Sequence, residues 1–356
     1  MNRRTFLAAG ATATTAGLAG CRSMFETRSA RSPPLVEDRP DAVYVPTHVE
    51  GMEMVGTSTA GDYQVALTYS FPHRFWTIDI DQRNKIEIQG SDTMHMMTTI
   101  WDPETTTVVP NNAVSTTVRR DGESLFSGRN LWPMISQNMS VHAGDNVALD
   151  GDGTYEVDIE VGPVSARTTG AFQNRFTEVG SATFTLDFQR STLEDVSFER
   201  LRDQQGELGA VDPMEMEMMP VARLPEPADM PGTHLGTAES GDARFVVLRT
   251  DLPEGVETEG DAESYLAISP RTPYNRYPLP LMALSARLTR GPDELFATSL
   301  QPTFDPDLGY HYGIAADPQD GDDLAIVVDS VPQLARHEGY EMAFLDFEDT
   351  DLTLSA

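Results

Sequence analysis

Apolar and polar residues alternate with a period of two along much of the chain. In the first half, three such runs have their apolar members at Tyr63, Val65, Leu67 and Tyr69; at Tyr155, Val157, Ile159 and Val161; and at Phe184, Leu186 and Phe188. Side chains spaced by two lie on one face of a β-strand, so each run predicts a strand with one face in a core. Only residues 193–208 have a pattern that would suit a helix. The chain is therefore predicted to be all-β.

The two halves of the chain repeat the same motifs in the same order. Residues 132–167 align without a gap on residues 301–336, at a constant offset of 169. The paired positions include Pro133 with Pro302, His142 with His311, Gly144 with Gly313, Pro163 with Pro332 and Arg167 with Arg336. The period is too long for a propeller blade or a solenoid unit, and it suits a β-sandwich. We expect two tandem immunoglobulin-like β-sandwich domains, residues 51–190 and a degenerate copy over 214–356, joined by a linker over 191–213.

The N-terminus has the features of an export signal. Arg3 and Arg4 precede an apolar run that is too short to span a bilayer and ends at small residues, and paired arginines indicate twin-arginine export. The sequence Leu-Ala-Gly that precedes Cys21 resembles a lipobox, in which the cysteine is acylated and becomes the first mature residue. Residues 1–20 are therefore predicted to be a lipoprotein signal peptide, and residues 21–50 a flexible tether. This predicts a protein that is exported and lipid-anchored to the extracellular face of the cell membrane.

Charge and cysteine content narrow the possible functions. Asp and Glu number 56 against 25 Lys and Arg, for a net charge of −31, which excludes nucleic-acid binding through a basic face. Lys85 is the single lysine, and such an acidic, lysine-poor composition is typical of halophilic proteins. Cys21 is the single cysteine, so the chain can form no internal disulfide and no blue-copper centre. A metal site must therefore use His, Met and carboxylate ligands.

Four residues of the first half are candidate metal ligands. Strand alternation places His95 and Met97 on one face, and Met134 and His142 follow further along the chain. Imidazole and thioether groups together suit copper, and imidazole also binds ferrous iron. We therefore expect a copper or iron site formed by these four residues. The alternative is that the methionines fill a core and the histidines serve structural roles.

Several of these motifs resemble a known family. The segments Trp132-Pro133-Met134 and His142-Ala143-Gly144 are similar to those of the periplasmic ferrous-iron transport lipoproteins that accompany iron permeases. In the second half, His311 within Gly-Tyr-His-Tyr-Gly and the pair Arg336-His337 match two further motifs of that family. The resemblance implies an immunoglobulin-like sandwich that binds copper, handles iron outside the membrane and pairs as a dimer, with metal sites near the interface and a permease as a possible partner.

The chain departs from this family in both halves. In the first half, Met97 stands at the family's glutamate position and Thr168 at that of the Arg-His histidine; in the second half, Thr303 stands at the methionine position and Tyr265 and Ala267 at those of the His-x-Glu pair. We hypothesise that the two domains pair within one chain as an intrachain pseudo-dimer. The competent site would be His95, Met97, Met134 and His142, with His311 and His337 as candidates for a second-domain site.

Catalytic motifs do not stand out. The sequence has no Gly-x-Ser-x-Gly, His-Glu-x-x-His or phosphate-binding glycine loop, so we predict that the protein is not an enzyme. The function predicted is binding and transfer of copper or iron at the cell surface. The alternative is a metal-free surface lipoprotein that acts as a protein-interaction module.

Overall fold

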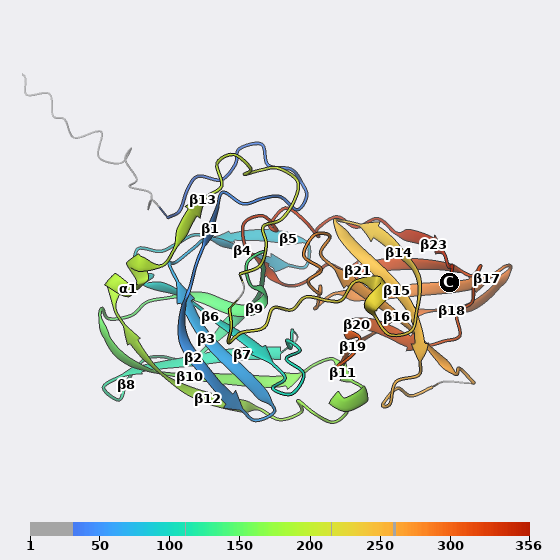
Figure 1. Cartoon of the computed structure of the whole chain (residues 1–356), viewed down its shortest axis with the longest axis horizontal. Coiled ribbons are helices and arrows are strands. Elements are labelled where there is room, and N and C mark those ends of the chain that lie inside the picture. Colours follow the sequence, from blue (N-terminus) through green and yellow to red (C-terminus); the bar gives the residue numbers. More distant parts are fainter. Residues whose placement is uncertain (1–30, 111, 215, 259–260) are drawn as a thin grey trace, which may run out of the picture. The chain divides into compact units, whose positions relative to one another are not determined.

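The computed structural model describes residues 31–110, 112–214, 216–258 and 261–356 of the chain. Residues 34–356 form one compact unit (Figure 1). The predicted signal peptide and Cys21 lie outside the described residues. Among the residues described, no helix is both long enough and apolar enough to cross a membrane. Strands dominate the unit, which confirms the all-β prediction.

The first half consists of two antiparallel layers that share one long strand. One layer has the order β12 (Gly180–Phe188), β10 (Gly153–Val164), β7 (Asn112–Arg120) and β8 (Glu123–Ser136). The other layer has the order β8, β9 (Ser140–Val147), β6 (Met94–Trp101), β3 (Tyr63–Ser70) and β2 (Glu53–Ala60). The three alternating runs of the sequence lie in β3, β10 and β12, and their apolar side chains are buried as predicted.

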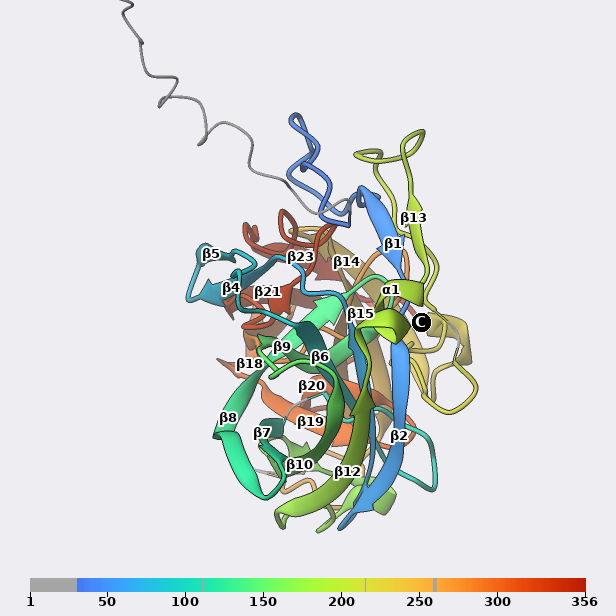
Figure 2. The ribbon, with the colours of Figure 1, turned by 90° about the vertical axis from the view of Figure 1, so that its left-hand side faces the viewer.

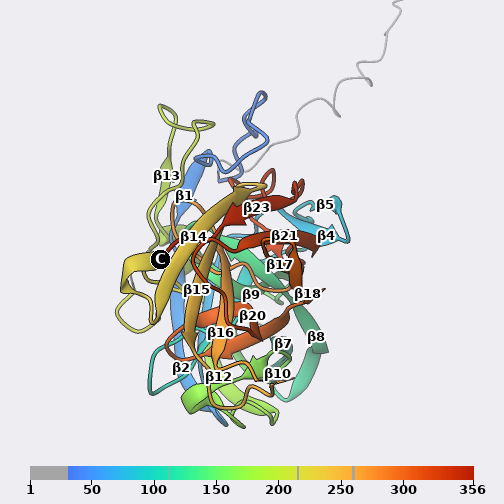
Figure 3. The same cartoon turned by 90° about the vertical axis from the view of Figure 1, so that its right-hand side faces the viewer.

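The second half, whose strands face the viewer in Figure 3, has the same strand order as the first. One layer contains β18 (Asp293–Ser299), β17 (Ala283–Arg290), β21 (Asp323–Ser330) and β23 (Thr350–Thr353). The other contains β19 (Gln301–Asp305), β20 (Gly309–Ala315), β16 (Ser264–Arg271), β15 (Ala243–Asp251) and β14 (Thr233–Ser240). Strands β18 and β19 together take the place that the single strand β8 has in the first half.

Each half contributes one short strand to a sheet of the other half. β22 (Ala335–Arg336), from the second half, pairs in parallel with β8 at Met134 and Ile135. It also pairs with β4 (Phe75–Asp79), which forms a hairpin with β5 (Gln82–Ile86). In return, β11 (Arg167–Thr168) pairs in parallel with β19 at Thr303 and Phe304. The halves also share a hydrophobic core, in which the rings of Phe172, in the short 3-10 helix η1 (Gly170–Phe172), and Phe304 stack 4.8 Å apart.

The segment predicted as a tether differs from the prediction in its second part. Val43 and Tyr44 are fully buried, and β1 (His48–Glu50) pairs with β13 (Phe198–Arg200) (Figure 2). Residues 43–50 therefore belong to the folded unit, because buried partners from the second half hold their side chains.

Residues 193–208, whose pattern would suit a helix, are helical only at their start. The helix α1 covers Arg190–Asp195, and its C-cap, Val196, has a non-helical backbone with φ −54° and ψ 131°. The chain then enters β13, whose hydrogen bonds to β1 replace those that a longer helix would have made. Beyond it, the short 3-10 helix η2 (Pro227–Asp229) precedes β14.

The close approach of β12 to β2 gives a test of the packing in the first half. A Cβ added to Gly180 would lie 2.2 Å from the carbonyl oxygen of Ala60. Gly180→Ala is therefore expected to lower the free energy of unfolding by about 1–3 kcal/mol, because a rigid backbone group must move. Denaturant unfolding measures the effect. Gly90→Ala is the matched control, since an added Cβ there meets no atom within 4 Å. Equal stability of the two variants would contradict the packing.

Candidate metal centre

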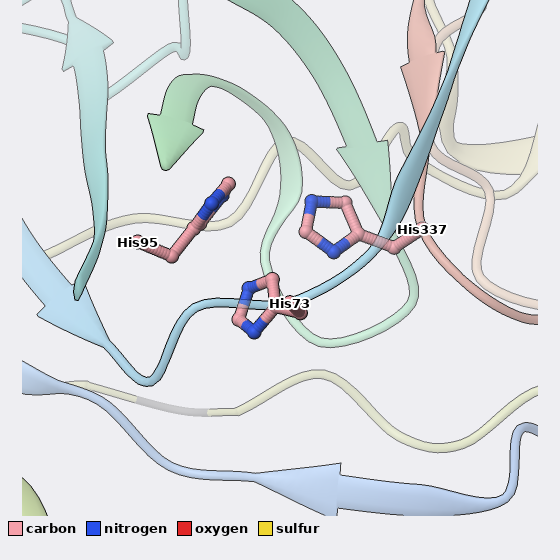
Figure 4. A group of neighbouring side chains, drawn as sticks. All are labelled: His73, His95 and His337. Carbon is pink, nitrogen blue, oxygen red and sulfur yellow. The ribbon is translucent and has the colours of Figure 1, made fainter. Parts of the chain in front are cut away.

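Three histidines from distant parts of the chain meet beside the sheet formed by β8, β9 and β6. His73 lies in the loop between β3 and β4, His95 lies in β6, and His337 directly follows β22. One ring nitrogen from each lies within 4.8 Å of the others, and the three side chains surround a common space (Figure 4). The ring of His73 lies 4.2 Å from that of His95 and 5.1 Å from that of His337, measured between centroids.

Two further candidate ligands adjoin this group. Met134 of β8 and His142 of β9 are direct cross-strand partners, so their side chains lie on the same face. The ring centroid of His142 lies 5.3 Å from that of His337. A Cβ added to Gly144 would lie 3.0 Å from Nε2 of His95 and 3.3 Å from Sδ of Met134. The missing side chain of this glycine thus leaves room for the imidazole and the thioether to approach each other.

Hydrogen bonds fix the proton position on two of the rings. Nδ1 of His142 lies 3.0 Å from the carbonyl oxygen of Ser140, which can only accept, so Nδ1 carries the proton. Nδ1 of His95 lies 2.9 Å from Oδ1 of Asn146, whose amide nitrogen donates to the carbonyl oxygen of His73 at 2.8 Å. Nδ1 of His95 is therefore also a donor. In both rings Nε2 is left with a free lone pair, as in a metal-binding imidazole.

Neither lone pair takes part in a hydrogen bond within the part of the chain that the structure describes. The Nε2 atoms of His95, His142 and His337 are all buried and lack a hydrogen-bond partner there. A buried polar atom left without a partner costs about 1–3 kcal/mol, and such atoms are rare in folded proteins. Three such atoms in one cluster form a site that suits an electron-pair acceptor such as a metal ion.

The electrostatics of the centre keep the imidazoles neutral. Burial lowers the pKa of His73 to about 3 and that of His142 to about 4. Burial, followed by repulsion from His73, lowers the pKa of both His95 and His337 well below its ordinary value. Glu50 lies behind the group, with Oε2 3.4 Å from Nδ1 of His73. The centre therefore offers neutral donors at neutral pH.

The sequence-predicted ligands are thus placed as follows. His95, Met134 and His142 lie together around the centre, and Met97 follows His95 by two residues on the same face of β6, opposite Gly144. His337 was predicted to pair with His311 in the second domain, but it lies with the ligands of the first half because β22 crosses over. His73 was missed. Its signal was its position after a strand-ending proline, next to the strand that carries His95.

The equivalent place in the second half has a different chemistry. Tyr265 stands opposite Ala315 and Ala267 opposite Gly313, so Tyr265 occupies the position that His95 has in the first half. Nδ1 of His311 donates to the carbonyl oxygen of Gly309 at 3.0 Å, so its Nε2 accepts a hydrogen bond from the Tyr265 hydroxyl at 3.2 Å. Arg167 donates to this hydroxyl at 2.9 Å and to Oγ1 of Thr303 at 2.8 Å. A guanidinium and two hydroxyls thus fill the space, and the His311 lone pair is satisfied.

Comparison with known families agrees with the motifs. Residues 103–192 match a family described as Fe2+ transport protein, and residues 228–353 match a domain family described as being of unknown function. The chain thus resembles the ferrous-iron transport family that its motifs indicated. The first match includes Met134 and His142, and the second includes His311 and His337.

The similarity of this chain to solved structures is weaker. The FetP protein of uropathogenic Escherichia coli, in its as-isolated form, is 19% identical, with a TM-score of 0.29 over 40% of this chain and 96% of its own. A copper-bound variant of FetP is also 19% identical, with a TM-score of 0.30 over 38% of this chain and 97% of its own. No curated protein matches the chain.

The lowered pKa values predict how the metal-free protein responds to acid. Below pH 6.5 the unfolded chain gains protons on these histidines that the folded chain refuses until about pH 4 or below. The free energy of unfolding should therefore fall as pH drops from 6.5 to 4.5, by up to about 1.4 kcal/mol per pH unit for each buried imidazole. Denaturant unfolding at constant salt measures this slope. His142→Gln removes one such group and should make the slope shallower; an unchanged slope would contradict the neutral, buried state.

Proposed function

We propose that the protein binds one copper ion through His95, Met134, His142 and His337, with His73 as a further donor on the outer side. The observation that carries this proposal is the cluster of three buried Nε2 atoms without partners within the described part of the chain. A metal ion would satisfy all three at once, whereas a protonated imidazole would place a positive charge among groups whose burial disfavours it.

The donor set favours copper over ferrous iron. Imidazole and thioether groups are neutral, and thioether is a soft ligand that selects Cu(I). A monovalent ion also loses less hydration free energy than a divalent ion when it enters a buried site. The family resemblance places a glutamate at position 97, and methionine there removes a hard anionic donor that iron would use. Glu50 adds a carboxylate behind His73, an arrangement that orients a metal-binding imidazole.

The architecture supports an intrachain pseudo-dimer with one competent centre. Equal strand order in the two halves and the reciprocal pairing of β22 with β8 and of β11 with β19 are what two copies of one domain would give. The crossing at Arg336-His337 supplies an imidazole to the first centre. The crossing at Arg167-Thr168 supplies a guanidinium to the second, and a fixed positive charge there excludes a metal cation.

The cellular role follows from the predicted export signal and the family match. An exported protein, lipid-anchored at Cys21 on the extracellular face, would bind the metal outside the membrane and deliver it to a permease in iron or copper uptake. The match to the Fe2+ transport family supports uptake as the role. The protein acts by coordination and transfer and catalyses no reaction.

A Cu(I) titration against a competing chelator tests the centre. The wild type is expected to bind one ion per chain, and the double variant His95→Ala/His142→Ala to bind more than about 100-fold more weakly, since removing ligands costs more than the 10- to 100-fold typical of their supporting residues. His337→Ala should also weaken binding, because it removes the proposed ligand that the second half supplies.

The control for these variants is His234→Ala, which removes a histidine that lies on the surface at β14. Its affinity should equal that of the wild type. Unchanged affinity in the double variant would overturn the assignment and leave a metal-free anchored module as the better account.

A further inference from the structure

The loop that carries His337 is held from its inner side by a buried arginine. Arg336 is fully buried and donates from Nη2 to the carbonyl oxygens of Pro332 at 3.2 Å and Phe344 at 3.0 Å. Nη1 of Arg336 donates to the carbonyl oxygen of Ala343. These bonds close residues 337–344 into a compact loop next to the metal centre.

The outer side of the same loop is held by residues 39–50, here called the latch. Glu341 is fully buried, and its Oε1 accepts from the Tyr44 hydroxyl at 2.6 Å and lies 2.8 Å from Nε of Arg39. Its Oε2 accepts from the backbone N–H of Gly339 at 2.8 Å. The Glu341 carboxylate therefore joins the latch to the loop two to four residues after the ligand.

Backbone bonds of the latch reinforce this contact. The N–H of Tyr44 donates to the carbonyl oxygen of Gly339 at 3.1 Å. The N–H of Thr47 donates to Oε1 of Glu338 at 2.9 Å, and the other oxygen of Glu338 accepts from Arg74 at 2.6 Å. Glu338, which directly follows His337, therefore contacts both the latch and Arg74, which directly follows His73.

The latch also reaches the other segments that supply ligands. Gln137, in the turn before the strand of His142, donates from Nε2 to the carbonyl oxygen of Tyr44 at 2.8 Å. Asn138 donates to the carbonyl oxygen of Glu50 at 3.0 Å, and the Glu50 carboxylate faces His73. The latch thus contacts the loops that carry His73 and His337 and the turn before the strand that carries His142. These segments come from both halves of the chain.

We propose that Tyr44 and Glu341 are positioning residues that hold His337 in the metal centre, and that docking of the latch controls metal retention. This inference rests on the proposed function. The latch follows the N-terminal region in which the lipid anchor is predicted, so a partner that displaces this segment would release His337 and weaken the hold on the ion. Linkage makes the effect reciprocal: metal binding strengthens latch docking by the same factor.

A double-mutant cycle on the full exported chain tests the positioning role. Tyr44→Phe removes one hydroxyl and Glu341→Gln removes the charge, and each is expected to lower Cu(I) affinity about 10- to 100-fold, as supporting residues of metal ligands do. In a His337→Ala background, Tyr44→Phe should have no further effect, because it acts through His337. A further loss of affinity in that background, equal to the loss in the wild type, would overturn the proposal.

Matched controls separate positioning from general destabilisation. Tyr155→Phe removes a buried hydroxyl that donates to Gly151, and Asp102→Asn removes a buried carboxylate paired with Arg175; both lie outside the centre. These variants are expected to lower thermal stability and leave Cu(I) affinity unchanged. If they weaken Cu(I) binding as much as Tyr44→Phe does, the latch has no special role.

Hydrogen exchange on the wild type gives a test that needs no variant. Cu(I) binding is expected to slow exchange of the Tyr44 and Thr47 amides, while the Tyr155 amide in β10 serves as an internal reference. Equal exchange with and without Cu(I) would overturn the latch. A wild type that binds no Cu(I) defeats the proposed function and this inference together, whereas tight binding with equal affinity in Tyr44→Phe defeats the latch alone.

Discussion

Two residues of the second half, Ala335 and Arg336, pair in parallel with β8 of the first, and the candidate metal centre depends on this contact. The pairing brings His337 to the face that carries Met134 and His142, although His337 lies about 200 residues further along the sequence than either. A strand of two residues contributes few backbone hydrogen bonds of its own. Its position is therefore secured by the buried guanidinium of Arg336 within and by the latch outside.

The second constraint is the burial of uncharged imidazole rings, whose nitrogen atoms need hydrogen-bond partners. Several imidazoles packed together exclude water, and with it the solvent that would satisfy their lone pairs, so the folded apoprotein carries an energetic cost that an ion would relieve. The second half relieves the same strain with Tyr265, Thr303 and Arg167, whose hydrogen bonds complete the network around His311. Hydrogen bonds therefore satisfy the buried imidazole of the second half, whereas those of the first half keep Nε2 atoms that could coordinate an ion.

Much of the fold could be predicted from sequence because strand alternation is a local signal, visible in β3, β10 and β12. The same alternation predicts His95 and Met97 on one face, whereas Met134 and His142 are assigned to the candidate site from the chemistry of their side chains and from the family resemblance. It could not place His337, whose position depends on a strand crossing between halves, or His73, which lies in a loop without periodicity. The sequence predicts a tether over residues 43–50 because their buried partners, Glu338 and Glu341, are almost 300 residues away. The helix-compatible pattern of residues 193–208 is helical only up to Asp195 for a similar reason, since the pairing of β13 with β1 is a non-local contact.

Because the two halves are covalently joined in one chain, they can change in sequence independently of each other. In an assembly of identical subunits, symmetry forces every substitution to appear at both crossings. Here Thr168 and His337 stand at matching points of one polypeptide, so either can change while its counterpart is preserved. One chain can therefore keep a site suited to a metal ion in its first half, while the matching place in its second half becomes a rigid, hydrogen-bonded contact between the halves.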